Sequence, residues 1–519
     1  MLLEEPATTA PFSLRTSSYT VYVDLPDDRD HLLLVHGYTG AYDKVSRGVA
    51  AYVRSLEASP APKPLYGEWS ANEILRDVAV APSEATLETL RRRGYLTERT
   101  IQEEEDFFVR NVTALHNVQM LSMPSYVIMP TYSCNLRCGY CFQDNMRTDP
   151  ALKHLLRTMT PAMADRILDS LPQIEQRHSV IADGKVPRQF TFFGGEPLLA
   201  ASRRAIEHFV RGAQKRGPSQ FGAISNGTEL EAYEDLLGPD GISYLQITLD
   251  GPADDHDQRR IYADGSGSFD KICANIDLAL RRGAAVSVRL NIDRDNFARL
   301  PELAELFEER GWTGNKHFSS YAAPVHSYET AAEVRERARL FNSWELNVAL
   351  AKIRESDPRM RAIGTTDDGL MARVLSIFTG RKAALPTMTS FCGAHNRMYI
   401  FDAFGDIYAC WERTGDQRIR IGNVDDTGTV VMNDERNGMW RSRTVASNPT
   451  CRKCRFALYC GGGCAVLAEG SSGTMFSNYC DAFGKRFRAR VAEAYGQFAG
   501  GAQISETSLQ AAEKREQLR

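Results

Sequence analysis

Eleven cysteines are spread unevenly along this 519-residue chain, and their grouping limits its structure more than any other feature. Ten of them fall in three tight groups, and only Cys273 stands apart. In a reducing compartment, grouped cysteines indicate metal sites more often than disulfides. We therefore expect a large part of the chain to be organised around bound metal, with Cys273 as a small buried side chain in a helix.

The first group is CNLRCGYC, which places Cys134, Cys138 and Cys141 in a C-x3-C-x2-C pattern. Three thiolates on one loop can hold three irons of a [4Fe–4S] cube and leave the fourth iron open to a substrate or cofactor. The alternative is a structural zinc site, which requires four ligands.

From about residue 124 the chain alternates between short apolar segments and helical patterns, which predicts an α/β fold with a parallel sheet or partial barrel. The cysteine loop directly follows the first of these strands, where such folds place their chemistry. Strands are expected at 126–132, 190–194, 222–225, 244–250, 285–292 and 316–322.

Outside this region we expect smaller elements. Residues 1–120 predict an α+β domain, with strands at 19–26 and 31–38, helices at 42–56, 83–94 and 99–118, and a Pro-rich linker at 59–64. The predicted domains are 1–120, a barrel at 121–328, a helical bridge at 329–390, a metal-organised segment at 391–490 in which regular periodicity fades, and a tail at 491–519.

Charge and hydropathy exclude some classes of protein. With 62 basic and 66 acidic residues the net charge is −4, which argues against a nucleic-acid partner. No apolar run reaches about 18 residues and no signal peptide is visible, so we expect no membrane span and a cytoplasmic location.

The cysteine spacing, with Tyr140 before the third cysteine, resembles the signature of the radical S-adenosylmethionine (SAM) superfamily over about residues 124–325. The resemblance implies a partial (β/α)6 barrel and a cluster that passes one electron to SAM. SAM then cleaves to methionine and a 5′-deoxyadenosyl radical, which removes a hydrogen atom from the substrate. An external reductant such as a flavodoxin or ferredoxin is implied as a partner.

Further motifs resemble the SAM contacts of this family. FFGGEP (192–197) resembles its Gly-Gly-Glu motif, in which Glu196 would bind the amino group of SAM and the glycines would allow close backbone approach. SNGT (225–228) would contact the ribose, and Arg289 would lie near the SAM carboxylate. The implied cofactor-binding residues are Tyr140, Gly194, Gly195, Glu196, Ser225, Asn226 and Arg289.

The remaining seven grouped cysteines resemble the SPASM domain, which binds two auxiliary [4Fe–4S] clusters and would bring the total to three. By position, the distal cluster would use Cys451, Cys454, Cys460 and Cys480. The cluster nearer the active site would use Cys392, Cys410 and Cys464, which leaves its fourth ligand open. Two structural zinc sites are the alternative.

Enzymes with this pair of domains mostly modify peptides or proteins. The leading interpretation is a maturase of a ribosomally made precursor peptide whose leader segment binds to residues 1–120 as an added strand. A second is formylglycine formation by a sulfatase maturase, against which Trp411 and Glu412 stand where that subfamily has an Asp after the cysteine matching Cys410. A small-molecule dehydrogenase and a non-enzymatic electron-transfer protein are further alternatives.

Replacing Cys134, Cys138 and Cys141 together with Ala should abolish 5′-deoxyadenosine formation from SAM. It should also remove about four irons per chain, because one cube loses its thiolates. Chromatography of the nucleoside product and an iron assay measure both effects. A triple variant that still cleaves SAM would contradict the central assignment.

Overall fold

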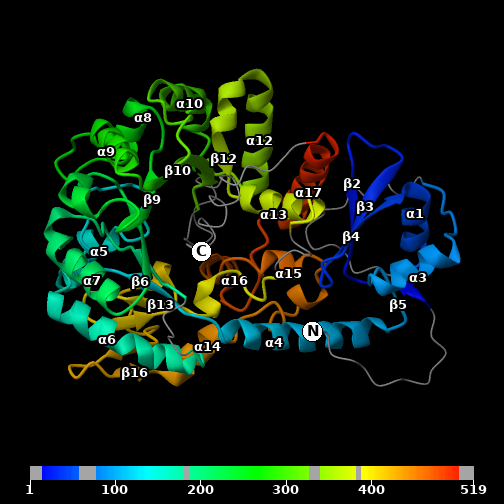
Figure 1. Cartoon of the computed structure of the whole chain (residues 1–519), viewed down its shortest axis with the longest axis horizontal. Coiled ribbons are helices and arrows are strands. Elements are labelled where there is room, and N and C mark those ends of the chain that lie inside the picture. Colours follow the sequence, from blue (N-terminus) through cyan, green and yellow to red (C-terminus); the bar gives the residue numbers. More distant parts are fainter. Residues whose placement is uncertain (1–13, 58–76, 181–185, 327–338, 382–386, 502–519) are drawn as a thin grey trace. The chain divides into compact units, whose positions relative to one another are not determined.

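A computed structural model describes residues 14–57, 77–180, 186–326, 339–381 and 387–501 (Figure 1). The chain folds into two compact units. We call residues 119–366 and 393–442 the barrel unit, and residues 1–118, 367–392 and 443–519 the terminal unit. The predicted linker at 59–64 and the end of the predicted tail lie outside the described residues, and the predicted domain boundaries stay a prediction.

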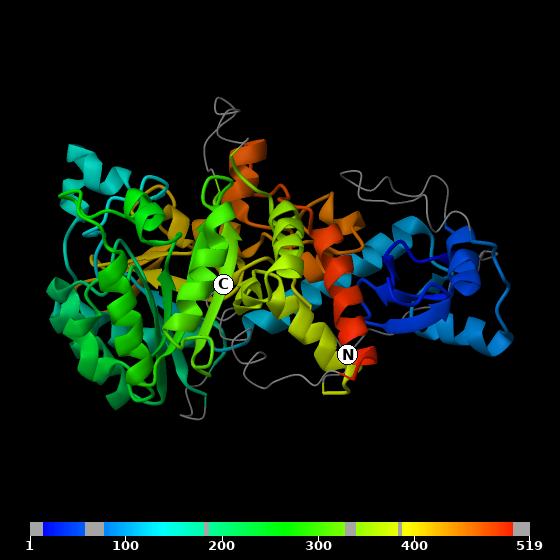
Figure 2. The same ribbon diagram turned by 90° about the horizontal axis from the view of Figure 1, so that it is seen from above.

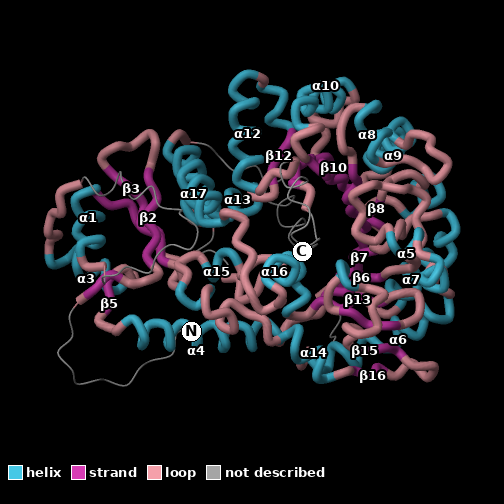
Figure 3. The backbone as a smooth tube through the Cα atoms, turned by 180° about the vertical axis from the view of Figure 1, so that it is seen from behind, coloured by secondary structure: helices cyan, strands magenta, loops and turns pink. Residues whose placement is uncertain are grey.

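The barrel unit is built on a run of seven parallel strands that are neighbours in chain order. Figure 3 shows several of them in succession. The strands are β6 (Ser125–Ile128), β7 (Arg188–Phe192), β8 (Ser219–Ser225), β9 (Ile242–Thr248), β10 (Ala285–Ile292), β11 (Phe318–Pro324) and β12 (Ile363–Thr365). The α/β prediction and all six expected strands are confirmed. The seventh strand, β12, falls in the expected helical bridge.

Helices connect these strands and lie on the outer side of the curved sheet (Figures 1 and 2). Phe190 and Phe192 of β7 stack on Phe221 of β8 and meet Phe209 of α7 edge-on, so aromatic packing fixes helix to sheet. The helices are α5 (Asn145–Thr148), α6 (Pro161–Arg177), α7 (Arg203–Lys215), α8 (Ala253–Arg259), α9 (Phe269–Arg281), α10 (Leu300–Glu309) and α12 (Ser343–Ser356).

Four short strands extend the same sheet beyond β6. β13 (Met398–Phe401) pairs in parallel with β6, and β14 (Asp406–Tyr408), β15 (Gly422–Val424) and β16 (Val430–Met432) follow in antiparallel order. A helix, α14 (Asp434–Arg441), comes next. Regular periodicity fades in the sequence after residue 391, yet strands form here, because strands of three or four residues carry too little alternation to be recognised.

The terminal unit begins with an antiparallel sheet in the order β2-β3-β4. The expected helix from residue 42 is wrong for its first five residues. Tyr42–Ser46 pairs with β3 residue for residue as strand β4, and α1 starts only where Ser46 caps it by accepting the N–H of Val49. The unit contains β1 (Arg15–Thr16), β2 (Thr20–Asp24), β3 (His31–His36), β5 (Leu96–Thr97), α1 (Arg47–Ser55), α3 (Glu84–Arg92), most of α4 (Ile101–Met120), α13 (Asp368–Phe378), α15 (Ala457–Cys460), α16 (Ala465–Ser472) and α17 (Phe483–Ala499).

The N-terminal sheet and the cysteine-rich C-terminal segment share one hydrophobic core. Val21 and Val35 of the sheet pack with Phe456, Tyr459 and Phe487. The Tyr459 hydroxyl also donates a hydrogen bond of 2.7 Å to the carbonyl of His36. Among the described helices, none combines the length and the apolar character that crossing a membrane requires.

Phe487→Ala should lower the free energy of unfolding of the terminal unit by about 3–5 kcal/mol, because Phe487 is fully buried and stacks on Tyr459 at 4.7 Å. Phe498→Ala, on the same helix but 40% exposed, is the matched control and should cost much less. Thermal unfolding measures both. Equal effects would contradict the shared core.

Candidate active site

The three cysteines of the first group lie on the loop between β6 and α5. The thiol of Cys134 accepts the backbone N–H of Leu136 at 3.4 Å, and that of Cys141 accepts a guanidinium N–H of Arg147 at 3.4 Å. Burial raises the pKa of Cys134 to about 12 and also raises the pKa of Cys138. Both groups are therefore protonated thiols in the metal-free protein, and a bound metal would displace these protons.

Within the described residues, no three His, Cys, Asp or Glu side chains lie close enough to share one metal ion. Each cysteine of a [4Fe–4S] site binds a different iron, so its thiolates stand farther apart than the ligands of a single ion.

The two glycines of the Gly-Gly-Glu segment allow its loop to contact the backbone of residues 131–133, which lead into the cysteine loop. A Cβ on Gly194 would lie 2.4 Å from the carbonyl oxygen of Thr131. One on Gly195 would lie 2.3 Å from those of Tyr132 and Ser133. The backbone N–H of Glu196 donates to the carbonyl of Ser133 at 2.7 Å. The glycines were expected to allow close approach of the backbone, and in the structure this approach is made between two segments of the chain.

Glu196 is the centre of a buried hydrogen-bonded set at the ends of β7 and β8. Its carboxylate is 1% exposed and accepts the Ser225 hydroxyl at 2.8 Å and the N–H groups of Leu198 at 2.8 Å and Asn226 at 2.6 Å. Burial raises its pKa to about 7. The Asn226 amide also donates to Asn135 at 2.8 Å, which ties the set to the cysteine loop.

Tyr140 connects the cysteine loop to the ends of β9 and β10. Its hydroxyl donates to Asp250 and accepts from Arg260 at 2.7 Å and from Asn291 at 3.1 Å. Arg289 joins the same cluster by donating to Asn291 at 2.8 Å.

Asp250, Arg260 and Asn291 are site residues that were not predicted from the sequence. Asp250 follows β9 and Asn291 lies at the end of β10, two residues after Arg289, so their position at the strand ends was a usable signal. Arg260 follows α8 in no recognisable pattern.

In the terminal unit, the structure brings together the four cysteines predicted to hold the distal cluster. Burial raises the pKa of Cys451 well above its usual range, and the neighbouring thiols of Cys460, Cys454 and Cys480 raise it further. The amide of Asn478 donates to Cys480 at 3.1 Å.

Arg443 is a buried cation near several of these thiols, and sequence analysis missed it. Burial lowers its pKa, and Cys392, Cys451, Cys464 and Cys460 raise it. Its guanidinium donates to the carbonyl of Ser477 at 2.9 Å. Cys410 follows β14 in the barrel unit, and its grouping with Cys392 and Cys464 stays a prediction. Cys273 is fully buried in α9, as expected, and burial raises its pKa to about 12.

Residues 128–307 match the sequence pattern of the radical SAM superfamily. The match runs from the end of β6 into α10 and identifies this part of the chain as a radical SAM domain. The chain is 22% identical over 388 residues to a cysteine-type anaerobic sulfatase-maturating enzyme of Clostridium novyi, covering 71% of this chain and 96% of the relative. A serine-type enzyme of that name from Bacteroides thetaiotaomicron is 24% identical over 365 residues, covering 66% of this chain and 82% of the relative.

One solved structure, native anSMEcpe with bound AdoMet and Cp18Cys peptide, superposes with a TM-score of 0.53 at 15% identity. The superposition covers 76% of this chain and all of that chain. It shows a shared fold.

The match to the radical SAM superfamily implies a [4Fe–4S] cluster and SAM, and the residues around the cysteine loop fit these groups. Several buried nitrogens have no hydrogen-bond partner within the described part of the chain: Nε2 of Gln143, Nε and Nη1 of Arg147, and Nε of Arg260. A buried donor without an acceptor is costly. Sulfur atoms of a cluster and the carboxylate of SAM would supply acceptors of the required kind.

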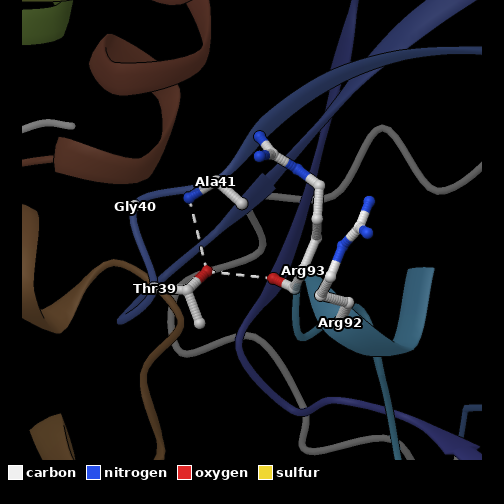
Figure 4. Close-up of a pocket in the computed structure, with 5 residues that line it drawn as sticks. All are labelled: Thr39, Gly40, Ala41, Arg92 and Arg93. Atoms are coloured by element: carbon white, nitrogen blue, oxygen red, sulfur yellow. Dashed lines mark hydrogen bonds between the residues drawn. The ribbon is translucent and has the colours of Figure 1, made fainter. Parts of the chain in front are cut away.

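A cavity of about 270 Å³ lies in the terminal unit, at the start of β4 (Figure 4). It is lined by Thr39, Gly40, Ala41, Arg92 and Arg93. The guanidinium of Arg93 pairs with Asp43 and donates to the carbonyl of Tyr42 at 3.0 Å. Arg92 is exposed and adds positive charge at the rim.

Gly195→Ala should lower the iron content and abolish SAM cleavage, because its Cβ would collide with backbone that cannot move without shifting the cysteine loop. Gly438→Ala on α14, where a Cβ meets nothing within 4 Å, is the control and should keep both properties. An iron assay and 5′-deoxyadenosine formation test the pair. A Gly195→Ala enzyme with normal iron would show that the loop is not held by this contact.

Proposed function

We propose that this radical SAM enzyme modifies a ribosomally made precursor peptide, installing a cross-link or another side-chain or backbone modification. The observation that carries the proposal is the edge of β4 that no described strand pairs with, beside the positively charged cavity. A protein or peptide substrate also agrees with the names of the sulfatase-maturating relatives.

The N-terminal sheet has the features of a peptide-binding site. β4 pairs with β3 along one edge, and no other described strand pairs with its second edge. An open strand edge offers backbone N–H and C=O groups to an added strand. A leader segment bound along β4 would bring one end of its strand near the cavity, where Arg92 would favour an acidic side chain.

The chemistry would take place in the barrel unit. When bound, the cluster and SAM supply a radical that takes a hydrogen atom from the substrate. Cys134, Cys138 and Cys141 would hold the cluster, and Glu196 would accept hydrogen bonds from the SAM amino group. The network around Tyr140 would keep the cysteine loop fixed against β9 and β10.

Two auxiliary clusters in the cysteine-rich segments would complete the set of three. The distal one would use Cys451, Cys454, Cys460 and Cys480. The other would use Cys392, Cys410 and Cys464, and we propose that its fourth ligand is not a cysteine thiolate, since Cys273 is buried inside α9.

Formylglycine formation on a protein Cys or Ser is the second candidate, favoured by the named relatives. The residue after Cys410 argues against it. Trp411 occupies this position, and its ring packs on Phe193 at 5.4 Å, next to the Gly-Gly-Glu segment. An indole cannot accept a proton as an aspartate can.

The two candidates give different products, which mass spectrometry separates. The enzyme, SAM and a reductant are incubated with short peptides encoded near the gene and with sulfatase peptides. A cross-linked peptide loses two hydrogens, whereas formylglycine is an aldehyde that a hydrazide captures. Formation of the aldehyde alone would contradict the leading proposal.

Recognition is tested with point variants, because deleting residues 1–120 would expose the core that the sheet shares with Phe456 and Phe487. Arg92→Glu should raise the KM for the leader-bearing peptide by about three- to tenfold, corresponding to about 1 kcal/mol of lost attraction. SAM cleavage without peptide should be unchanged. Arg91→Glu, also exposed on α3, is the control. If Arg91→Glu raises the KM for the peptide as much as Arg92→Glu does, the cavity has no specific role in recognition.

A further inference from the structure

Arg147 is a buried cation in contact with the cysteine loop. It lies on α5, six residues after Cys141, and its side chain is 3% exposed. Nη2 donates to the Cys141 thiol at 3.4 Å and to the Asp144 carboxylate at 3.2 Å. Because the Asp144 side chain is 41% exposed, water screens its charge and it compensates the guanidinium only in part.

The other two nitrogens of this guanidinium are buried and have no hydrogen-bond partner in the described part of the chain. Leaving such donors unsatisfied costs about 1–3 kcal/mol for each group, and more for a charged one. Gln143, four residues earlier and 3% exposed, has an amide nitrogen in the same condition. Within the described residues, two side chains that are close in sequence and near the cysteine loop thus carry buried donors without an acceptor.

The charge of Arg147 is retained in this setting. An arginine guanidinium is not deprotonated in proteins, so Arg147 stays positively charged beside Cys141. Arg147 contacts Cys141 and lies within electrostatic range of Cys134, two of the three predicted ligands. The sulfur atoms of an iron–sulfur cluster are hydrogen-bond acceptors.

We propose that Arg147 is a positioning and redox-tuning residue of the cluster on Cys134, Cys138 and Cys141, to whose sulfur atoms its guanidinium donates hydrogen bonds. The proposal rests on the assignment of these three cysteines as ligands. Reduction adds a negative charge to the cluster. A buried cation and hydrogen bonds to sulfur stabilise the reduced state and raise the reduction potential.

The test is a redox titration of the reconstituted enzyme followed by electron paramagnetic resonance. The signal of this cluster is identified by its change when SAM is added. Arg147→Gln should lower the potential by a shift equivalent to at least tenfold in the reduction equilibrium, about 59 mV for one electron. Arg147→Lys keeps the charge and should lower the potential by less than half as much as Arg147→Gln. Arg204→Gln, an exposed arginine on α7, is the control for loss of a positive charge and should leave the potential unchanged.

Each outcome decides the proposal. An unchanged potential in Arg147→Gln with weakened SAM binding would assign Arg147 to the SAM carboxylate and overturn the proposal. If Arg147→Gln fails to hold its iron, Arg147→Lys decides: iron retained with a potential near that of the wild type supports the role of the charge, and iron lost overturns it. A wild-type enzyme with no SAM-sensitive signal would overturn the ligand assignment and this proposal together, whereas an unchanged potential would overturn only the role of Arg147.

Discussion

The contact of Gly194 and Gly195 with the backbone of residues 131–133 is the constraint on which the site depends. It brings the end of β7 against the end of β6 with no side chain between them, and only glycine allows this spacing. The Glu196 carboxylate is thereby placed where Ser225 and Asn226, at the end of β8, can donate to it. These contacts connect the ends of β6, β7 and β8 with the cysteine loop.

The polar groups at this edge of the sheet are too deeply buried to be favourable on their own. Glu196, Asp250 and Arg260 are each nearly inaccessible to water, and burying such groups costs free energy unless each is paired. Most of their partners come from neighbouring loops, so displacing one loop would leave charged groups unpaired in the others. Among the buried donors without a partner in the described part of the chain, those of Gln143, Arg147 and Arg260 belong to the cysteine loop or to residues in contact with it, and we infer that the cofactors complete this network.

Much of this arrangement could be predicted from the sequence, because long strands and spaced cysteines are local patterns. Strands β6 to β11 of the barrel unit and the loop that carries Cys134 were found in this way, and the segments of Glu196 and Ser225 were singled out by their resemblance to a known family. The short strands β12 to β16 were not, since a three-residue strand is stabilised by its neighbours in the sheet and has no period of its own. Arg147, Arg260 and Arg443 were missed for a related reason. An arginine on a solvated helix and one buried beside thiols look the same in sequence, and only tertiary contacts separate them.

In the terminal unit, the sheet proposed to bind the substrate is in contact with the segment proposed to bind metal, which the order of segments along the chain does not suggest. Arg455, next to Cys454, donates to the carbonyl of Thr20 in β2, and a Cβ on Gly37 would lie 2.3 Å from the carbonyl of Arg455. The turn that carries two of the predicted distal ligands is therefore packed directly on the N-terminal sheet. Free energy gained when metal binds to cysteines in such a segment is also folding free energy for whatever shares its core. If the sheet binds a leader peptide, the chain would recognise its substrate fully only when the distal cluster is in place, and an enzyme without its clusters would also be deficient in binding.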